Sequence, residues 1–207
     1  MMHEETEELA PEPPEVVVRV QTISDAKALT GHFERMFEQG QPYYRDADDA
    51  DGEPWTFLPD MVEGYVDVWQ PIEGPTGRER SVIAVAITLS MPTGTDPLIN
   101  GAAALALARR EFADREHVWV SGDHEGPFVK FLVQYRDEDD RPLKSGPSDL
   151  RRYRDLYAQE LCARGVVAQA TSRGSRGLGS YASRDAYKAR QRVAQTPNTD
   201  GDDRGAQ

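Results

Sequence analysis

The chain has one cysteine, Cys162, among its 207 residues, which excludes a disulfide within the chain. A single thiol is typical of proteins in reducing compartments. No apolar run approaches the ~18 residues that span a bilayer, so we expect no membrane segment. The opening MMHEETEELAPEPPE is acidic and proline-rich, unlike a secretion or transit signal. Together these absences predict a cytoplasmic protein.

The composition allows one folded core. Hydrophobic residues make up 38% of the chain and charged residues 29%, which places it on the polar side of globular proteins. A length of 207 residues favours one domain with tails. We expect an acidic disordered tail over 1–14, one domain over 15–177, and a mobile basic and polar tail over 178–207.

Charge is divided unevenly along the chain. Residues 1–140 hold 11 Lys and Arg against 29 Asp and Glu, whereas residues 141–207 hold 13 against 7. A uniformly acidic protein would be repelled by nucleic acid. The acidic part could instead bind a basic partner protein, and the basic part could contact phosphates, unless both are ordinary solvated surface.

Hydrophobic periodicity predicts an α+β domain. The expected strands are 15–23, 81–90, 116–122, 127–137 and 166–172, and the expected helices are 25–39, 98–115 and 149–165. Segment 40–55 is read as an acidic loop or hairpin, and 57–80 as a short helix or irregular segment followed by a turn. Ser24 and Ser148 are the expected helix N-caps. We expect a mostly antiparallel sheet of about five strands with helices packed on one face and disordered termini.

Three of these elements have predicted buried faces. Helix 98–115 is expected to bury Ile99, Ala102, Ala106 and Phe112, and helix 149–165 to bury Leu150, Tyr153, Tyr157 and Leu161. Alternation along strand 127–137 places its side chains on two sides, with Phe128, Lys130, Leu132 and Gln134 together on one of them.

Several segments, taken in order, resemble the plasmid mobilisation relaxases, which are HUH-type, MobA-like DNA strand transferases. They are LSMPTGTDP (89–97), ARREFADREHVWV (108–120), GDHEGPFVKFLVQYRDEDDRPL (122–143) and DLRRYRDLYAQELCARGVVAQATSRGSRG (149–177). Nearer the N-terminus, GHFERMFEQG (31–40) is similar to the family's AHLDYISRNG. The resemblance covers roughly residues 15–177 and rests on many weak matches in the right order. It implies a relaxase-like sheet.

The resemblance also implies a chemistry. Relaxases of this family cut one DNA strand by attack of a tyrosine hydroxyl on a phosphodiester, and a divalent metal held by histidines neutralises the developing charge. The family's HPHVH motif lies on a strand, where alternate side chains point to one side and converge on one ion. A further histidine, within an HTD motif, comes from the preceding strand.

This chain departs from the family pattern at each of those histidines. The HPHVH positions fall on Gly126, Pro127, Phe128, Val129 and Lys130. The HTD histidine falls on Ser121, while its aspartate matches Asp123. The nucleophilic tyrosine falls on Arg35, and a neighbouring histidine matches His32. Glycine, phenylalanine and lysine side chains do not hold a divalent ion. We therefore expect no metal, no cofactor and no catalytic residue at the inherited site.

Lys130 lies on the strand face expected to look into the inherited metal site. Its ammonium could bind a phosphate as a point charge, or it could be an edge-strand lysine that discourages aggregation. The resemblance places the basic helix and turn that follow near DNA, although ordinary surface charge is the alternative. The predicted nucleic-acid contacts are Lys130, Arg151, Arg152, Thr171, Arg173 and Arg176.

An active enzyme with a rebuilt site is one alternative. Tyr43 or Tyr44 would supply a displaced nucleophile, and His124 with Asp123 and His117 would hold Mg²⁺ or Mn²⁺. The competing interpretation is that the two tyrosines pack a loop and that His124 is a solvated loop histidine. His32 is expected at a helix surface or between helices.

The sequence thus predicts a catalytically degenerate relaxase-like domain, serving as a DNA-binding or relaxase-associated accessory protein of a plasmid or mobile element. The expected partners are single-stranded or hairpin DNA and other mobilisation proteins. Two alternatives stay open. One is the active metal-dependent strand transferase, and the other is a protein-interaction module whose acidic surface binds a basic partner or mimics DNA.

Overall fold

The computed structural model describes residues 14–45, 53–69 and 82–170. Its strands are β1 (Val17–Ile23), β2 (Tyr43–Arg45), β3 (Trp55–Thr56), β4 (Ala84–Ser90), β5 (His117–Asp123) and β6 (Pro127–Gln134). Its helices are α1 (Ala26–Gln39), the 3-10 turn η2 (Pro59–Met61), α2 (Val62–Trp69), α3 (Pro97–Glu111) and α4 (Pro147–Cys162). The predicted tails lie outside the described residues, apart from residue 14.

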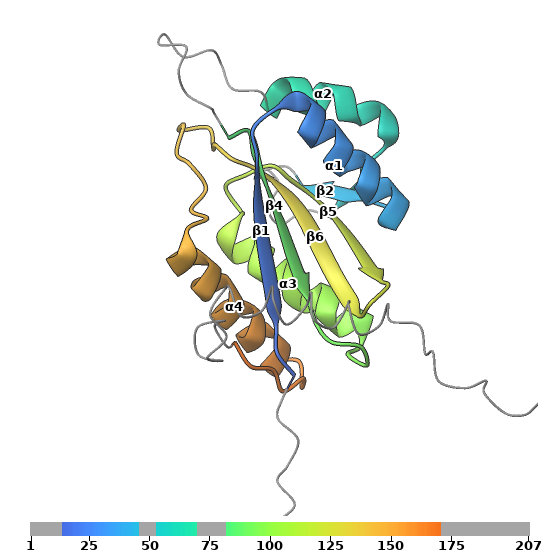
Figure 1. The fold of residues 1–207 in the computed structure, drawn as a ribbon, viewed down its shortest axis with the longest axis vertical. Helices are drawn as coiled ribbons and strands as arrows, with labels where there is room; N and C mark the ends of the chain where they lie inside the picture. Colours follow the sequence, from blue (N-terminus) through green and yellow to red (C-terminus); the bar gives the residue numbers. More distant parts are fainter. Residues whose placement is uncertain (1–13, 46–52, 70–81, 171–207) are drawn as a thin grey trace, which may run out of the picture. The chain divides into compact units, whose positions relative to one another are not determined.

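The strands form one sheet in the order β1-β4-β6-β5-β2-β3, shown in Figure 1. Every pair in it is antiparallel. The α+β class is confirmed, with six strands where about five were expected. The extra strands are β2 and β3, which pair as the hairpin that was one reading of segment 40–55. The predicted strand 166–172 is reduced to an isolated bridge between Glu15 and Gln169.

The β5–β6 hairpin forms as predicted and lies inside the sheet. Its register runs from His117 opposite Val133 to Asp123 opposite Pro127. The other side of β6 pairs along its length with β4, so β6 is an interior strand. Lys130, in the middle of β6, is therefore not an edge-strand lysine, and that interpretation of it is wrong.

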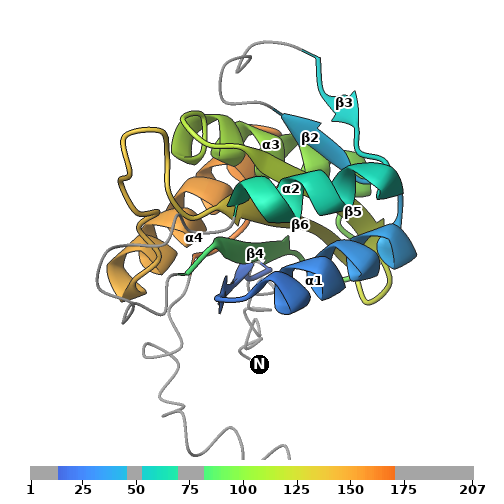
Figure 2. The same ribbon diagram turned by 90° about the horizontal axis from the view of Figure 1, so that it is seen from above.

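Helices cover both faces of the sheet, not one as expected (Figure 2). On one face, α3 and α4 pack on Val85 and Ile87 of β4 and on Phe131 of β6. On the other, α1 and α2 pack on Ala84, Ala86 and neighbouring strand residues. Alternate residues of β4 thus belong to two separate cores, as the two-residue period of a strand requires. The two sides are called here the α1 face and the α3 face.

Two helices begin at other residues than predicted. The N-cap of α1 is Asp25 rather than Ser24, and its carboxylate accepts a hydrogen bond from the Ala28 N–H at 2.7 Å. The N-cap of α4 is Gly146 rather than Ser148. Pro147 suits a first helical turn because that turn needs no N–H donor from it. The C-terminal end of α1 is as predicted, with the Gly40 N–H donating to Met36 O.

The buried side predicted for helix 98–115 is correct in part. Phe112 is buried and Ile99 packs against the core, but Ala102 and Ala106 are not core residues. The buried residues of α3 are Asn100, Ala103, Ala104, Leu107 and Ala108. Ala102 is exposed and Ala106 is half-buried. An alanine-rich helix has apolar residues all round, so its sequence pattern specifies the buried side weakly. The buried Asn100 is accommodated because its amide oxygen accepts a hydrogen bond from the Tyr157 hydroxyl of α4.

Within the described part of the chain, no helix combines the length and the apolar character needed to cross a bilayer.

Candidate functional site

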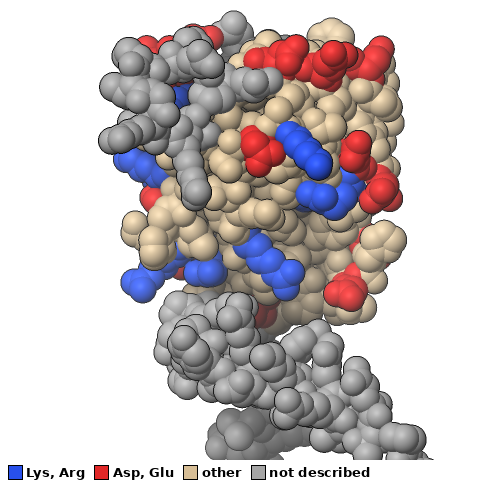
Figure 3. All heavy atoms as spheres, turned by 45° about the horizontal axis from the view of Figure 1, so that its top comes forward, with Lys and Arg blue, Asp and Glu red and all other residues tan. Residues whose placement is uncertain are grey.

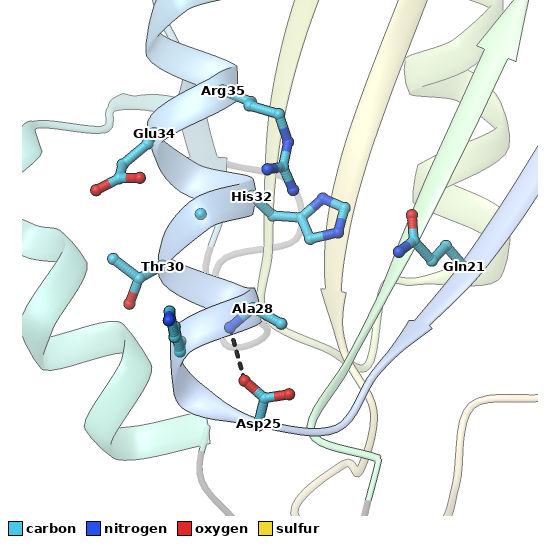
Figure 4. A pocket seen from close by; sticks show the side chains of 9 residues that line it. Gln21, Asp25, Ala28, Thr30, His32, Glu34 and Arg35 are labelled. Carbon is cyan, nitrogen blue, oxygen red and sulfur yellow. Dashed lines mark hydrogen bonds between the residues drawn. The ribbon is translucent and has the colours of Figure 1, made fainter.

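Helix α1 positions the first polar groups of the candidate site. Leu29, Phe33 and Met36 are completely buried, and this packing fixes the rotation of the helix on the sheet. His32 and Arg35 are three residues apart and so share one side of the helix. In Figure 4 the His32 ring points across toward β1, and the Arg35 guanidinium lies near it.

A groove of about 680 Å³ lies beside α1. Its lining residues are Gln21, Asp25, Lys27, Ala28, Thr30, Gly31, His32, Glu34 and Arg35. Gln21 comes from β1 and points toward His32, whereas Thr30 and Glu34 extend from the opposite side of the helix (Figure 4). Asp25 lies at the start of the helix, where it is occupied as the N-cap.

The strands bring further cations to the α1 face. Lys130 is on this face because Leu132, two residues on, packs in the α1 core. The register aligns Arg19 of β1, Thr88 of β4 and Lys130 of β6 in one row across the sheet. Lys130 and His32 are buried, at 8% and 5% exposed, whereas Arg19 and Arg35 are exposed. The α1 face therefore combines buried and exposed basic groups.

The contrast with Arg115 shows how unusual Lys130 is. Arg115 is similarly buried, but its guanidinium pairs with Asp137 at 3.3 Å and donates to Tyr135 O at 2.9 Å. Lys130 has neither an ion pair nor a hydrogen bond with any described residue. Buried charges are normally paired because an unpaired one loses its hydration without compensation.

Three of the basic groups of the α1 face, His32, Arg35 and Lys130, oppose one another electrostatically. Burial, followed by the positive charges of Lys130 and Arg35, lowers the pKa of His32 to about 4. Burial and then Arg35 also lower the pKa of the Lys130 ammonium. The Nδ1 atom of His32 is buried and has no hydrogen-bond partner among the described residues. Although Asp25 and Glu34 also line the groove, His32, Arg35 and Lys130 form no ion pair with a described residue.

The positions that the resemblance assigns to metal ligands are occupied as follows. Phe128 shares the α1 face with Lys130, and its ring lies over Gly122, where a Cβ atom would be 2.6 Å from the ring carbons. Gly126 has φ +114°, and a Cβ there would be 2.5 Å from Met91 O, so the backbone leaves no room for a side chain. Ser121 pairs with Val129 and faces α3. The assignment of the upstream histidine to Ser121 therefore does not place it beside Phe128 and Lys130.

The residues of the alternative active site are not brought together. Tyr43 stacks on Trp119 with ring centroids 6.0 Å apart, and Tyr44 packs edge-on against Phe57 and Tyr65. Asp123 is four residues beyond Trp119, which is about 13 Å along a strand. Both tyrosines pack in strand β2 and not in a loop.

Of the three other polar residues of that alternative, His117 is separated from the adjacent Asp123 and His124. His124 is exposed in the turn that follows Asp123. His117 lies at the opposite end of β5, in the α3 core, where its Nδ1–H donates to Arg115 O at 2.9 Å. Burial is the main cause that lowers the pKa of His117 to about 4. His117 is therefore a core histidine.

The predicted nucleic-acid contacts fall on different parts of the chain. Arg151 and Arg152 are exposed on α4, which covers the face of the sheet opposite Lys130. Arg152 is engaged in ion pairs with Glu111 at 2.7 Å and Asp149 at 3.8 Å. The remaining contacts, Thr171, Arg173 and Arg176, lie outside the described residues.

Among the residues that the structure describes, no three His, Cys, Asp or Glu side chains are grouped as metal ligands. The donor chemistry of the α1 face does not suit a divalent cation either. His32 is one neutral ligand there, whereas the Arg35 and Lys130 side chains are positively charged. The divalent metal implied by the resemblance therefore does not fit the residues present.

Known structures place this architecture among the relaxases. No protein-family model matches the chain, and no curated protein matches it in sequence. It is similar to the conjugative relaxase TrwC in complex with oriT DNA, at 9% identity over 89% of this chain and 86% of that one, with a TM-score of 0.53. It is also similar to the MobM relaxase domain bound to 26-nucleotide pMV158 oriT DNA, at 13% identity over 76% and 91% of the two chains, with a TM-score of 0.51.

These similarities establish that the chain has a relaxase-like fold, of the kind found in conjugation and plasmid mobilisation proteins. They confirm the fold that the ordered weak motifs implied.

The sequence interpretation overlooked two members of the candidate site. His32 was expected at a helix surface or between helices, but it is buried against the sheet. The sequence assigns Arg35 to the position of the nucleophile, but does not indicate that its charge acts on Lys130. Leu29, Phe33 and Met36 mark the apolar side of this helix clearly. The three-residue spacing of His32 and Arg35 then indicates that the two side chains lie on one side of it.

Proposed function

We propose that this chain is a catalytically degenerate relaxase-fold domain that binds DNA as an accessory of a plasmid or mobile element. The observation that carries the proposal is the group of basic side chains on the α1 face that lacks acidic partners among the described residues. In a relaxase-like fold these side chains occupy positions that the resemblance assigns to catalysis, namely Arg35 for the nucleophile and Lys130 for a metal ligand.

A DNA backbone supplies what the α1 face is missing. Phosphate oxygens carry negative charge and accept hydrogen bonds from Lys and Arg side chains. The Arg35 guanidinium is exposed at the groove and Lys130 is buried behind, so a phosphate could be approached by a fork of donors and by a fixed point charge. Phosphate contact would offset the cost of holding Lys130 unpaired.

The overall charge requires that such binding be local. The chain carries a net charge of −12, which repels a polyanion at long range. On the face seen in Figure 3, Lys and Arg side chains lie near the middle and along the left and lower edges, and acidic side chains lie mostly along the upper and right margins. We therefore expect a small number of phosphate contacts on single-stranded or hairpin DNA, and no extended non-specific coating of duplex.

The lack of strand cleavage is part of the proposal and rests on two side chains. An arginine at position 35 cannot form the phosphotyrosyl bond that a tyrosine forms. The Phe128 ring occupies the space over Gly122 on the α1 face. The chain would then hold a DNA strand, or present it to an active relaxase, without cutting it.

The test measures binding and cleavage separately. Fluorescence anisotropy with labelled single-stranded and hairpin oligonucleotides should show binding that weakens with salt, with a log–log slope of about −0.7 for each phosphate neutralised. The same oligonucleotides, incubated with Mg²⁺ or Mn²⁺, should give no covalent adduct on a denaturing gel. Absence of binding at low salt would refute DNA binding and favour a basic protein partner, and an adduct would refute degeneracy.

A further inference from the structure

The side chains that meet beside α1 come from different elements and share one property. Arg35 and His32 project from α1 and Gln21 faces them from β1. Lys130 of β6 does not line the groove, but its charge acts on His32. Each can donate a hydrogen bond, and none is a carboxylate. A divalent cation there would meet the charges of Arg35 and Lys130 with one imidazole as its ligand. The chemistry of this cluster favours an oxyanion.

His32 adds a feature that a simple cationic patch lacks. Its imidazole is 5% exposed, and its Nδ1 atom has no hydrogen-bond partner among the described residues. Protonation in the empty site would create a third positive charge beside Arg35 and Lys130, which is unfavourable. An oxyanion among the three groups would reverse that balance, because it attracts the imidazolium and accepts its N–H.

We propose that the groove beside α1 binds one tetrahedral oxyanion through Arg35 and His32, which line it, in the field of the nearby Lys130 ammonium, and that the His32 imidazole takes up a proton from solvent as the anion binds. The proposal rests on the proposed function in one respect, since it identifies the physiological oxyanion as a phosphate of bound DNA. It adds that the site acts without a metal and that it favours the anion more strongly at acidic pH.

Other groups near His32 do not alter this expectation. From α1, Asp25 is engaged as the N-cap and Glu34 extends from the other side of the helix (Figure 4). The row of β1, β4 and β6 residues on this face contributes Arg19, Thr88 and Lys130. Arg35 and Lys130 are the charged groups whose field acts on the imidazole. The groove, at about 680 Å³, has room for a phosphate with part of a nucleotide.

Sulfate is a suitable probe because it is tetrahedral and does not titrate between about pH 3 and 8. The histidine ring signals of the full ¹⁵N-labelled chain would be followed by NMR across that range in sodium chloride and in sodium sulfate at equal ionic strength. Burial and its neighbours lower the pKa of His32 to about 4. Sulfate should raise that pKa by at least about one pH unit, as a nearby opposite charge does. The ring signals of His124, which is exposed and does not line the groove, provide a reference in both salts.

Variants identify the groups that hold the anion. Arg35→Gln changes an exposed residue and should abolish most of the sulfate effect on His32. Lys130→Met should do the same and should also raise the pKa of His32 in chloride, since it removes a repelling charge. Arg109→Gln removes an exposed cation from α3, across the sheet, and should leave the sulfate effect intact. His32→Gln assigns the signal.

The outcomes separate this inference from the proposed function. Identical His32 titrations in chloride and sulfate would overturn the oxyanion site, and this comparison requires only the wild-type chain. A sulfate effect that survives in both Arg35→Gln and Lys130→Met would also overturn it. If sulfate raises the pKa of His32 but no oligonucleotide binds, the oxyanion site is supported and the proposed DNA binding is refuted. If oligonucleotides bind but sulfate leaves the pKa of His32 unchanged, DNA binding is supported and the oxyanion site is refuted.

Discussion

Lys130 holds a positive charge within the sheet, and the described residues provide no counter-charge for it. Proteins rarely keep such a group, because desolvation of an unpaired ammonium opposes folding. Burial and Arg35 lower the pKa of Lys130 accordingly. A buried charged side chain that forms no ion pair or hydrogen bond with a described residue is typical of a binding position. We therefore expect removal of this charge to reduce DNA binding without reducing the stability of the fold.

The first prediction concerns stability. Lys130→Met keeps most of the aliphatic stem and removes the ammonium, so the free energy of unfolding in urea should rise by about 1 kcal/mol. Arg115→Met is the matched control, because Arg115 is equally buried but paired with Asp137. That change should lower stability by about 2 kcal/mol, since it removes the ion pair with Asp137 and the hydrogen bond to Tyr135 O. Equal losses in both variants would mean that Lys130 has a partner.

The second prediction concerns acid sensitivity. Burial is the main cause that lowers the pKa of both His32 and His117 from 6.5 to about 4. The unfolded chain then binds more protons than the folded one between those values, so stability is complete above pH 6.5 and falls as the pH drops toward 4. We expect a loss of about 2 kcal/mol for each histidine between pH 7.5 and 5.

Urea denaturation at both pH values measures this loss. His117→Asn keeps a donor for Arg115 O and should remove about half of the pH dependence. If the change in the free energy of unfolding between the two pH values is the same in this variant as in the wild type, His117 does not contribute to it. This comparison does not depend on the absolute stability of the variant. Replacement of the exposed His124 should leave the slope as in the wild type.

At the scale of elements, sequence patterns predicted what local physics determines. Alternation placed Phe128 and Lys130 together on one side of their strand, and the β5–β6 hairpin followed from two close apolar runs. Element ends were less predictable, because Asp25 and Ser24 are both good N-caps and only packing selects one. The prediction for α3 is correct for Phe112 and wrong for Ala102 and Ala106, because its alanines give little contrast between sides.

The turn of the β5–β6 hairpin gives the third prediction. Gly126 has φ +114°, and a Cβ atom at this position would lie 2.5 Å from the carbonyl oxygen of Met91. Gly94 has φ +97° but no neighbour within 4 Å of the place of a Cβ atom. Gly94→Ala should therefore cost about 1 kcal/mol for backbone strain alone, and Gly126→Ala about 1–2 kcal/mol more for the contact. Thermal unfolding of both variants checks this, and equal melting temperatures would contradict it.

At the scale of the whole molecule, the sheet separates groups that the sequence placed in one list. Lys130 lies on the α1 face, whereas Arg151 and Arg152 lie on α4 across the sheet. One phosphate cannot touch both sets. Sequence could not reveal this, since the face that each helix covers depends on long-range packing and strand order. The resemblance to relaxases predicted the fold correctly because it drew on the order of many segments.

The same separation gives a fourth prediction, for a DNA strand bound at the α1 face. Arg151→Gln combined with Arg152→Gln should leave the affinity of a short oligonucleotide within about twofold, because the α4 side chains lie on the opposite face. A longer strand that wraps round the molecule would lose affinity in this variant. Anisotropy measurements with oligonucleotides of increasing length distinguish the two cases, and loss of short-strand binding would contradict an interface confined to the α1 face.

The most direct test of the central claim compares single-stranded oligonucleotide binding by wild type, Lys130→Met and Arg109→Gln, with a chelator present. We expect Lys130→Met to weaken oligonucleotide binding about tenfold or more, as loss of a charge-assisted contact does. The salt dependence of binding should then correspond to about one fewer neutralised phosphate. Arg109→Gln should change the affinity less than twofold. Equal affinities of wild type and Lys130→Met, or binding that vanishes when divalent metal is chelated, would contradict the account.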